Sequence, residues 1–337
     1  MQKKIIALAI ATAFAAPVAM AADGVTVYGT VDAGVKSFTS AGNTANTMSS
    51  DLYNTNRWGV KVSEDLGDGM KATANLEGGF NTASGDSNST TSVFDRGTSV
   101  GISSGDNAVV LGGNQYSTSF KVIKSYDPMD YHFLPVTGAS SISIATRHDS
   151  DIAYTGKFGD VTVIANKALG TAGDDSASNA AIGATFKSGA INAGAAYSTQ
   201  KPVAGGLSDV TQITFGGGFN FGPGSVKAGY ATMTTKAASG GLQDAKRNNV
   251  WLGATFDMSD KIGFGFGYYK IGTTASVATS ATAIEATDVR MLLSATYALS
   301  KKTNFYAEMD KKTTNTGATG AVDVDSNGYA VGLATTF

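Results

Sequence analysis

The chain has 337 residues, of which 25 are basic, 27 are acidic, 42 are glycine and none is cysteine. The slightly acidic balance argues against a nucleic-acid partner, and the lack of cysteine excludes a disulfide-stapled fold. No run of about 18 apolar residues follows residue 22, so the sequence predicts no transmembrane helix in the mature chain. High glycine with only 5 prolines suits a chain made of strands and turns.

The N-terminus has the pattern of a signal peptide. Two lysines precede the apolar stretch Ile5–Ala16, and Ala19-Met20-Ala21 has the small residues of a cleavage site. The alternative is a membrane anchor, which Pro17 and the cleavage pattern disfavour. We therefore predict a signal peptide over residues 1–21 and a mature domain over residues 22–337, exported to a bacterial envelope.

The first strand expected in the mature chain is Val25–Phe38. Valine recurs on one of its faces, whereas Asp32 and Lys36 lie on the other. This alternation is typical of a membrane strand with lipid on one side and water on the other. The polar segment Thr39–Thr55 that follows is expected to be a surface loop.

The next two strands, Asn56–Ser63 and Met70–Phe80, are expected to form a hairpin around a glycine-containing turn. Alternation along them directs Arg57, Lys61 and Lys71 to the polar face. The remaining strands follow in the same manner to the C-terminus. They are Phe94–Ser103, Ala108–Tyr116, Ser143–Lys157, Val161–Ala168, Asn179–Lys187, Ala190–Thr199, Val210–Phe221, Ser225–Thr234, Asn248–Phe256, Lys261–Ile271, Thr287–Leu299, Thr303–Asp310 and Ser326–Phe337.

Short turns alternate with longer loops along the chain, as in outer-membrane barrels, where the short turns lie on the periplasmic side. Because backbone polar groups cannot stay unpaired in lipid, strands that cross a membrane must close into a barrel. Tyr329 and Leu333 fit this view, since they lie on an apolar stripe of the last strand. Aromatic residues near strand ends, among them Tyr28, Trp251 and Tyr306, are expected to form interfacial girdles. We therefore predict an all-β fold: a 16-stranded antiparallel transmembrane β-barrel with short periplasmic turns and long extracellular loops.

Several stretches of the chain are similar to one known family. They are Val25–Gly34, Arg57–Gly59 with Ser63–Ala72 and Glu77–Phe80, Ser99–Ser103 with Val110–Gly112, and the C-terminal Phe337. Together they resemble the general, non-specific porins of the beta-proteobacterial and neisserial type. The resemblance implies a homotrimer and a third loop that folds into the lumen as a constriction. Ser117–Ala139 is the third and longest of the predicted loops, so it is assigned that role.

A pore of this kind depends on the charged side chains that face its lumen. The predicted constriction residues are Arg57, Lys61, Lys71, Arg96 and Arg147 on the wall, and Lys121, Lys124, Asp127 and Asp130 in the loop. Strand parity directs Arg96 outward unless a bulge intervenes, and it is included because it adjoins a family-like segment. Opposed charges across a narrow aqueous gap create a transverse field that biases ion passage. Two alternatives stay open: the inward charges are only solvated, or the loop carboxylates pair with the loop lysines.

Other chemistry has little support in the sequence. The chain has 2 histidines, His132 and His148, and neither lies in a nucleophile motif, so no enzyme is predicted. Asp323–Gly328 matches the first half of a calcium loop, but Ala334 stands where the bidentate glutamate belongs. A weak cation site there stays open beside the simpler interpretation as a polar turn. No cofactor and no metal is predicted.

These observations predict a homotrimeric outer-membrane porin, through which small hydrophilic solutes and ions diffuse passively, with a slight preference for anions. Its other partners would be outer-membrane lipid and lipopolysaccharide, and no nucleic acid. Two alternatives remain: a substrate-specific outer-membrane channel, or a non-conducting barrel that acts as an adhesin or structural protein. Saturable flux would distinguish the first, and lack of conductance the second.

Overall fold

The computed structural model of the chain describes residues 24–138, 145–170, 177–201, 209–236, 244–277, 280–318 and 322–337. The predicted signal peptide over residues 1–21 lies outside this part of the chain, as does the start of the strand predicted from Ser143. Ala139, the last residue of the predicted constriction loop, also lies outside it.

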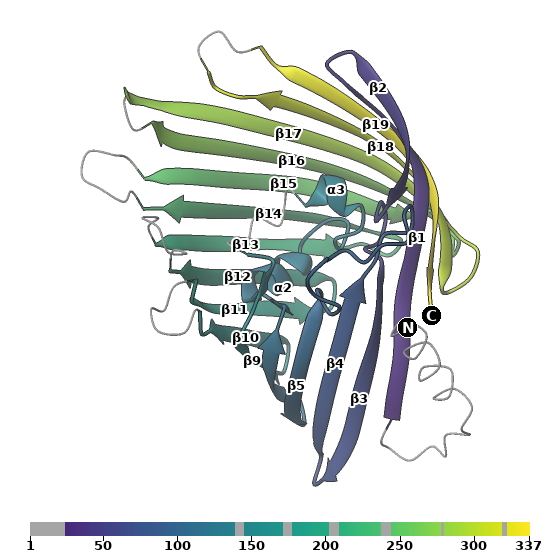
Figure 1. Cartoon of the computed structure of the whole chain (residues 1–337), viewed down its shortest axis with the longest axis vertical. Coiled ribbons are helices and arrows are strands. Elements are labelled where there is room, and N and C mark those ends of the chain that lie inside the picture. Colours follow the sequence, from purple (N-terminus) through teal and green to yellow (C-terminus); the bar gives the residue numbers. More distant parts are fainter. Residues whose placement is uncertain are drawn as a thin grey trace.

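Sixteen antiparallel strands of the described chain form a closed barrel (Figure 1). They are β1 (Gly24–Ser40), β3 (Arg57–Gly67), β4 (Met70–Gly79), β5 (Gly97–Ser104), β6 (Asn107–Gly113), β9 (Asp151–Phe158), β10 (Val161–Ala168), β11 (Asn179–Ser188), β12 (Ile191–Gln200), β13 (Val210–Asn220), β14 (Gly224–Thr235), β15 (Ala245–Asp257), β16 (Ile262–Val277), β17 (Ser280–Ala298), β18 (Thr303–Asn315) and β19 (Val324–Thr336). Each pairs with its neighbour along the chain, and β1 pairs with β19 to close the sheet. The prediction of a 16-stranded antiparallel barrel is therefore confirmed.

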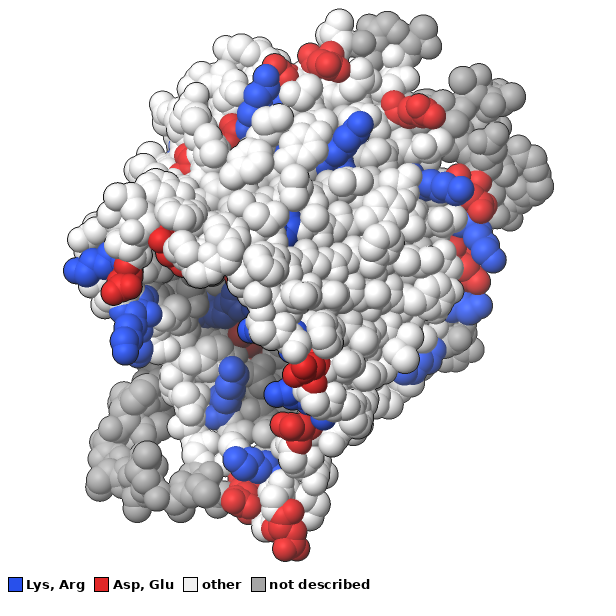
Figure 2. Space-filling view, turned by 180° about the vertical axis from the view of Figure 1, so that it is seen from behind, with Lys and Arg blue, Asp and Glu red and all other residues white. Residues whose placement is uncertain are grey.

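Side chains alternate between the two faces of this wall, as the sequence predicts. Val25, Ile182 and Leu293 lie exposed on the outer face, whereas Asp32 and Lys36 point into the lumen. In Figure 2 a broad area of uncharged side chains covers the outer wall, and charged side chains gather towards its edges. An apolar outer face with polar ends is what a lipid bilayer requires of a barrel.

The two ends of the barrel differ in their connections. At one end, here called the short-turn end, turns of two to four residues join the strands. In the turn Asp68-Gly69, Gly69 supplies a φ of +75°. At the other, here the long-loop end, most connections are longer. The hairpin of β16 and β17 reaches further than predicted, since β16 continues to Val277 and β17 begins at Ser280. Hydrogen-bonded pairing continues there because two strands can support each other beyond the barrel rim.

The segment Thr39–Thr55, predicted as a surface loop, is mostly ordered structure. Strand β2 (Asn43–Ser50) folds back on the far half of β1, while the near half of β1 pairs with β3. A polar sequence can form a strand here, because β2 pairs with the part of β1 that lies beyond the residues paired with β3. Residues 51–56 then turn inward, and Leu52 is buried inside the barrel.

The third loop lies inside the barrel, as the family resemblance implies (Figure 1). It contains two short helices, α2 (Thr118–Lys124) and α3 (Leu134–Thr137). Its base is closed by β7 (Gln115–Tyr116), which pairs with β8 (Arg147–His148). No helix of the described residues is both long and apolar enough to cross a membrane.

Three aromatic residues expected in the interfacial girdles instead face the lumen. Trp251 and Tyr306 are almost fully buried against the third loop or its neighbours, and the Tyr28 hydroxyl meets inward polar groups. Their parity matches the inward residues of their strands. The girdle prediction was wrong for these residues because it used their position near strand ends and ignored the face on which they lie.

Candidate functional site

The third loop docks on the inner face of the wall formed by β10–β19. Val122, Ile123 and Tyr126 of the loop pack with inward residues, including Trp251 and Tyr269, in one buried cluster. The Trp251 ring stacks on Tyr126 with centroids 5.8 Å apart, and its Nε1 donates to the Tyr126 carbonyl at 3.2 Å. Burial of these large side chains holds the loop against one side of the lumen.

Two inward glycines make this close packing possible. A Cβ at Gly216 would lie 2.3 Å from a Tyr126 ring carbon, and one at Gly253 would lie 2.5 Å from the Pro128 Cβ. Because both distances are far below van der Waals contact, the loop could not sit as close to the wall with any side chain there.

The inward-turned residues 51–56 hold the far part of the same loop. The buried Asp32 carboxylate accepts bonds from the backbone N–H groups of Tyr53 and Asn54, and from the Tyr306 hydroxyl at 2.7 Å. The Tyr53 ring then stacks on His132 of the third loop, with centroids 4.3 Å apart and planes within 4°. His132 Nδ1 lies 2.7 Å from Asn54 Oδ1. We call this set the inner latch: Asp32, Tyr53, Asn54, His132 and Tyr306.

The wall opposite the docked loop carries arginines around one carboxylate. Arg96 Nε donates to Glu77 Oε1 at 2.8 Å, and its Nη2 donates to the Tyr116 hydroxyl at 3.2 Å. The Arg147 guanidinium lies 3.9 Å above the Tyr116 ring, and its Nε donates to the Arg96 carbonyl at 2.8 Å. Glu77 also interacts electrostatically with Arg57. Three cations thus lie around Glu77, and the charges of Arg57 and Arg96 also act on Asp51.

Arg96 therefore faces the lumen, against the direction that strand parity gives it. Strand β5 begins only at Gly97, so Arg96 belongs to the preceding turn and the alternation of β5 does not extend to it. Its inclusion among the candidate residues agrees with this placement, although the parity argument was wrong.

A fourth cation extends this wall towards the short-turn end. Lys61 Nζ lies 4.4 Å above the Tyr28 ring, and the Tyr28 hydroxyl lies 2.8 Å from Glu77 Oε2. Arg57, on the same strand and face, donates from Nε to the Thr55 carbonyl at 3.0 Å. We call Arg57, Lys61, Arg96 and Arg147 the basic wall.

Lys71 does not join the basic wall. It lies inward but next to the first residue of β4, opposite Asp65 and close to the short-turn end. Gly79, the partner of Arg57, is eight residues further along β4, which corresponds to roughly 26 Å. Parity alone placed Lys71 on the correct face but could not give its depth.

The charged residues of the third loop have different surroundings. Lys121 is half-buried near Asp151, and this burial lowers the pKa of its ammonium group. Lys124 is exposed. Asp127 is fully buried, and its Oδ1 accepts bonds from the backbone N–H groups of Met129 and Tyr131 at 3.0 and 3.1 Å. Its carboxylate orders the loop and lies away from the open lumen.

Asp130 is the exposed carboxylate of the loop, and it pairs with a cation that the sequence analysis missed. Lys227 Nζ lies 2.5 Å from Asp130 Oδ1 and also donates to the Asp127 carbonyl at 3.2 Å. Lys227 lies on β14, on the wall where the loop docks. Its neighbours Val226 and Ala228 face outward, so alternation would have revealed Lys227 as an inward cation.

Burial lowers the pKa of His132 below its usual range, although the Asp130 charge opposes this effect. Burial likewise lowers the pKa of His148, against Asp151 and Asp149. Both histidines are therefore neutral at neutral pH, and each can take up a proton only in a more acidic medium than usual.

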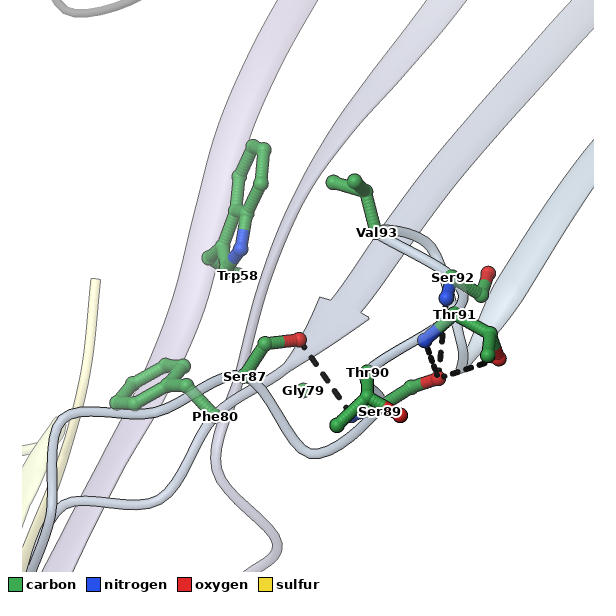
Figure 3. A pocket seen from close by; sticks show the side chains of 9 residues that line it. All are labelled: Trp58, Gly79, Phe80, Ser87, Ser89, Thr90, Thr91, Ser92 and Val93. Carbon is green, nitrogen blue, oxygen red and sulfur yellow. Dashed lines mark hydrogen bonds between the residues drawn. The ribbon is translucent and has the colours of Figure 1, made fainter. Parts of the chain in front are cut away.

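The remaining candidate features lie outside this region. Asp325 pairs with Lys311 at 3.0 Å and Asp323 accepts a bond from Asn315, so these carboxylates bind strand β18 and its end. The described residues contain no group of three or more potential metal ligands. A pocket lies between Trp58 and the loop residues 87 and 89–93, where serine and threonine side chains border it (Figure 3).

Comparison with known proteins agrees with this architecture. An outer membrane porin protein of Bordetella pertussis is 30% identical over 172 residues, which cover 46% of this chain and 44% of that protein. An anion-selective porin from Comamonas acidovorans has a similar fold, with a TM-score of 0.77 at 24% identity, covering 94% of this chain and all of that chain. OmpT of Vibrio cholerae, in a trimer form, matches with a TM-score of 0.71 at 18% identity over 94% and 99% of the two chains.

The matched part of the Bordetella protein is less than half of its length, and the two solved structures establish likeness of fold. The sequence profile of Gram-negative porins matches residues 7–318, which is most of the chain. The barrel is accordingly an outer-membrane protein. With a closed 16-stranded barrel, a third loop inside the lumen and this match over residues 7–318, the chain belongs to the Gram-negative porin family.

Proposed function

We propose that the barrel is a water-filled channel through which small hydrophilic solutes and ions diffuse passively. The observation that carries this proposal is the one-sided docking of the third loop. The loop is fixed on the wall of β10–β19, and the basic wall stands opposite, with Lys61 exposed and Arg57 half-exposed. Polar side chains that border water, on a rigid wall, are what a diffusion pore needs.

The charges of the two sides favour anions. The basic wall has four cations, and the carboxylates near it are Glu77 and Asp51. The two carboxylates predicted to oppose it are engaged elsewhere, since Asp127 is buried in the loop and Asp130 pairs with Lys227. The field across the constriction therefore comes mainly from the basic wall, and it would attract anions and repel cations.

We also propose that three copies assemble in the membrane, with the short turns in the periplasm and the long loops outside. The trimer form of OmpT from Vibrio cholerae, a protein of similar fold, supports this assembly. The apolar outer face would contact lipid, and the polar groups at the long-loop rim would contact lipopolysaccharide.

Single-channel recording in a planar bilayer tests the channel. We expect ohmic current steps, which arrive in groups of three, and a reversal potential under a salt gradient with the sign of an anion-selective pore. A correctly folded barrel, identified by its heat-dependent mobility in gels, that carries no current would refute the proposed function.

A further inference from the structure

A second group of cations lines the lumen between the third loop and the long-loop end. Arg247 on β15, Arg290 on β17 and Lys312 on β18 all have inward parity. Arg290 lies just beyond the docked loop, because its Nη1 donates to the Pro135 carbonyl of α3 at 3.4 Å. Leu292, two residues closer to the short-turn end, is part of the buried cluster that holds the loop.

These three cations share one nearby carboxylate. Both Asp288 oxygens accept bonds from Arg290, at 3.0 and 3.1 Å, and Lys312 Nζ lies 3.2 Å from Asp288 Oδ2. Arg247 lies close enough to Arg290 and Asp288 for their charges to act on it. Asp288 is thus already bonded to two cations, and the Arg247 charge is in excess.

Arg247 also has an unused donor. Its Nε is buried and has no hydrogen-bond partner among the described residues. Leaving a buried N–H of a charged group unbonded is unfavourable, so an acceptor from outside the chain would be bound there. An oxyanion would meet both needs, because guanidinium groups bind carboxylates and phosphates through paired N–H donors.

The inward acids further along β18 are already paired. Glu308 and Asp310 on β18 bind Lys36 at 3.1 and 3.0 Å. They lie four and two residues closer to the short-turn end than Lys312, further from Arg247, and each is already bonded to a cation. Their charges therefore weaken the attraction at Arg247 only slightly.

We propose that Arg247, Arg290 and Lys312 form a binding site for a multivalent oxyanion at the outer entrance of the pore. The site rests on the proposed channel function for its role: it would concentrate anionic solutes that carry carboxylate or phosphate groups before they reach the basic wall. Binding at a site before the constriction raises the local concentration of these anions.

The test uses citrate and inorganic pyrophosphate as probes of the purified protein. In bilayers we expect each probe to reduce the current at lower concentration when added on the long-loop side. Arg247→Gln should raise the blocking concentration from that side about tenfold, as expected for the loss of one charged hydrogen bond. Arg247→Lys should have an intermediate blocking concentration, since lysine keeps the positive charge but lacks the paired N–H donors of the guanidinium group. The probe that reduces the current at the lower concentration identifies the preferred oxyanion.

Lys246→Gln is the matched control, because Lys246 is the adjacent residue and is exposed on the outer face. The probes should reduce the current of this variant at the same concentration as that of the wild type. Calorimetric titration of the same proteins in detergent measures binding without current. Arg247-dependent heat without any current would support the site and refute the channel. Normal current with block and heat unchanged in Arg247→Gln would overturn the site and leave the channel standing.

Discussion

The two sides of the lumen follow one alternation rule and carry different inner faces. On β1, β3 and β4 the inward positions are polar or charged, as at Arg57, Lys61 and Glu77. On β10–β19 several inward positions are apolar and buried, as at Ile164 and Leu292. The first wall borders water, and the third loop packs on the inner surface of the second.

The comparison shows that the lumen of this barrel has a hydrophobic core on one side. Trp251 and Tyr269 face inward on strands whose outer faces are also apolar, as at Leu252 and Phe266. A strand with apolar residues on both faces, in a barrel whose lumen is otherwise polar, therefore marks the docking wall of an internal loop. The open, charged wall then determines what passes.

The largest expected effect is on the basic wall. Arg57→Glu with Lys61→Glu removes two of the four cations of this wall and adds two carboxylates to it. The reversal potential should change sign, because cations are then attracted to the constriction. Lys167→Glu is the control, since Lys167 is exposed on the outer face of β10 and the same type of charge change there should leave the potential nearly unaltered. An unchanged sign in the double variant would show that another surface sets the selectivity.

A side chain under the third loop should disturb the docking wall instead. Gly216→Val would place atoms inside the Tyr126 ring, so we expect the loop to shift and the barrel to lose about 1–3 kcal/mol through overpacking. Current should become noisier, and the temperature of heat-modification in gels should fall. Ala228→Val, on the exposed outer face of the next strand, adds volume without this contact. Equal behaviour of the two variants would mean that the loop is not held at Gly216.

Alternation predicts the barrel well, because inside and outside differ in solvent along every strand. It assigned the correct face to Lys61 and Lys71, and to the stripe that contains Tyr329. It failed at Arg96, which precedes its strand. At Trp251 parity gives the correct inward face, and the prediction was wrong because it relied on the position near a strand end. Periodicity carries no information outside a strand.

The site was only partly predictable, for a related reason. Asp127 and Asp130 were expected to act together, yet one orders the loop and the other pairs with Lys227, almost 100 residues away in sequence. The inner latch joins Asp32, residues 51–56 and His132, which come together only when the barrel closes. Contacts that depend on closure of the sheet have no local sequence signal.

The latch should respond to acid through His132. Because burial lowers the pKa of His132 below 6.5, the unfolded chain takes up the proton first, and the free energy of unfolding falls as the pH drops below 6.5. His132→Gln should remove part of this loss and His148→Gln another part, since burial also lowers the pKa of His148. Unfolding temperatures measured between about pH 5 and 8 would check this, because that interval includes the usual pKa of histidine. If the double variant His132→Gln with His148→Gln lost as much stability in acid as the wild type, the effect would come from carboxylates.

The smallest effect is expected at Lys71, which shares the inward face with the basic wall but not its depth. Roughly 26 Å of strand separates it from the level of Arg57, about three Debye lengths at physiological salt. Lys71→Glu should therefore shift the reversal potential far less than Lys61→Glu, although both make the same change of charge on the same inner surface. The shift should grow when the salt concentration is lowered to about 0.01 M, where the Debye length reaches about 30 Å and the distant charge is felt at the constriction. Equal shifts from the two variants at high salt would contradict this, because they would place the step that selects ions near the short-turn end rather than between the third loop and the basic wall.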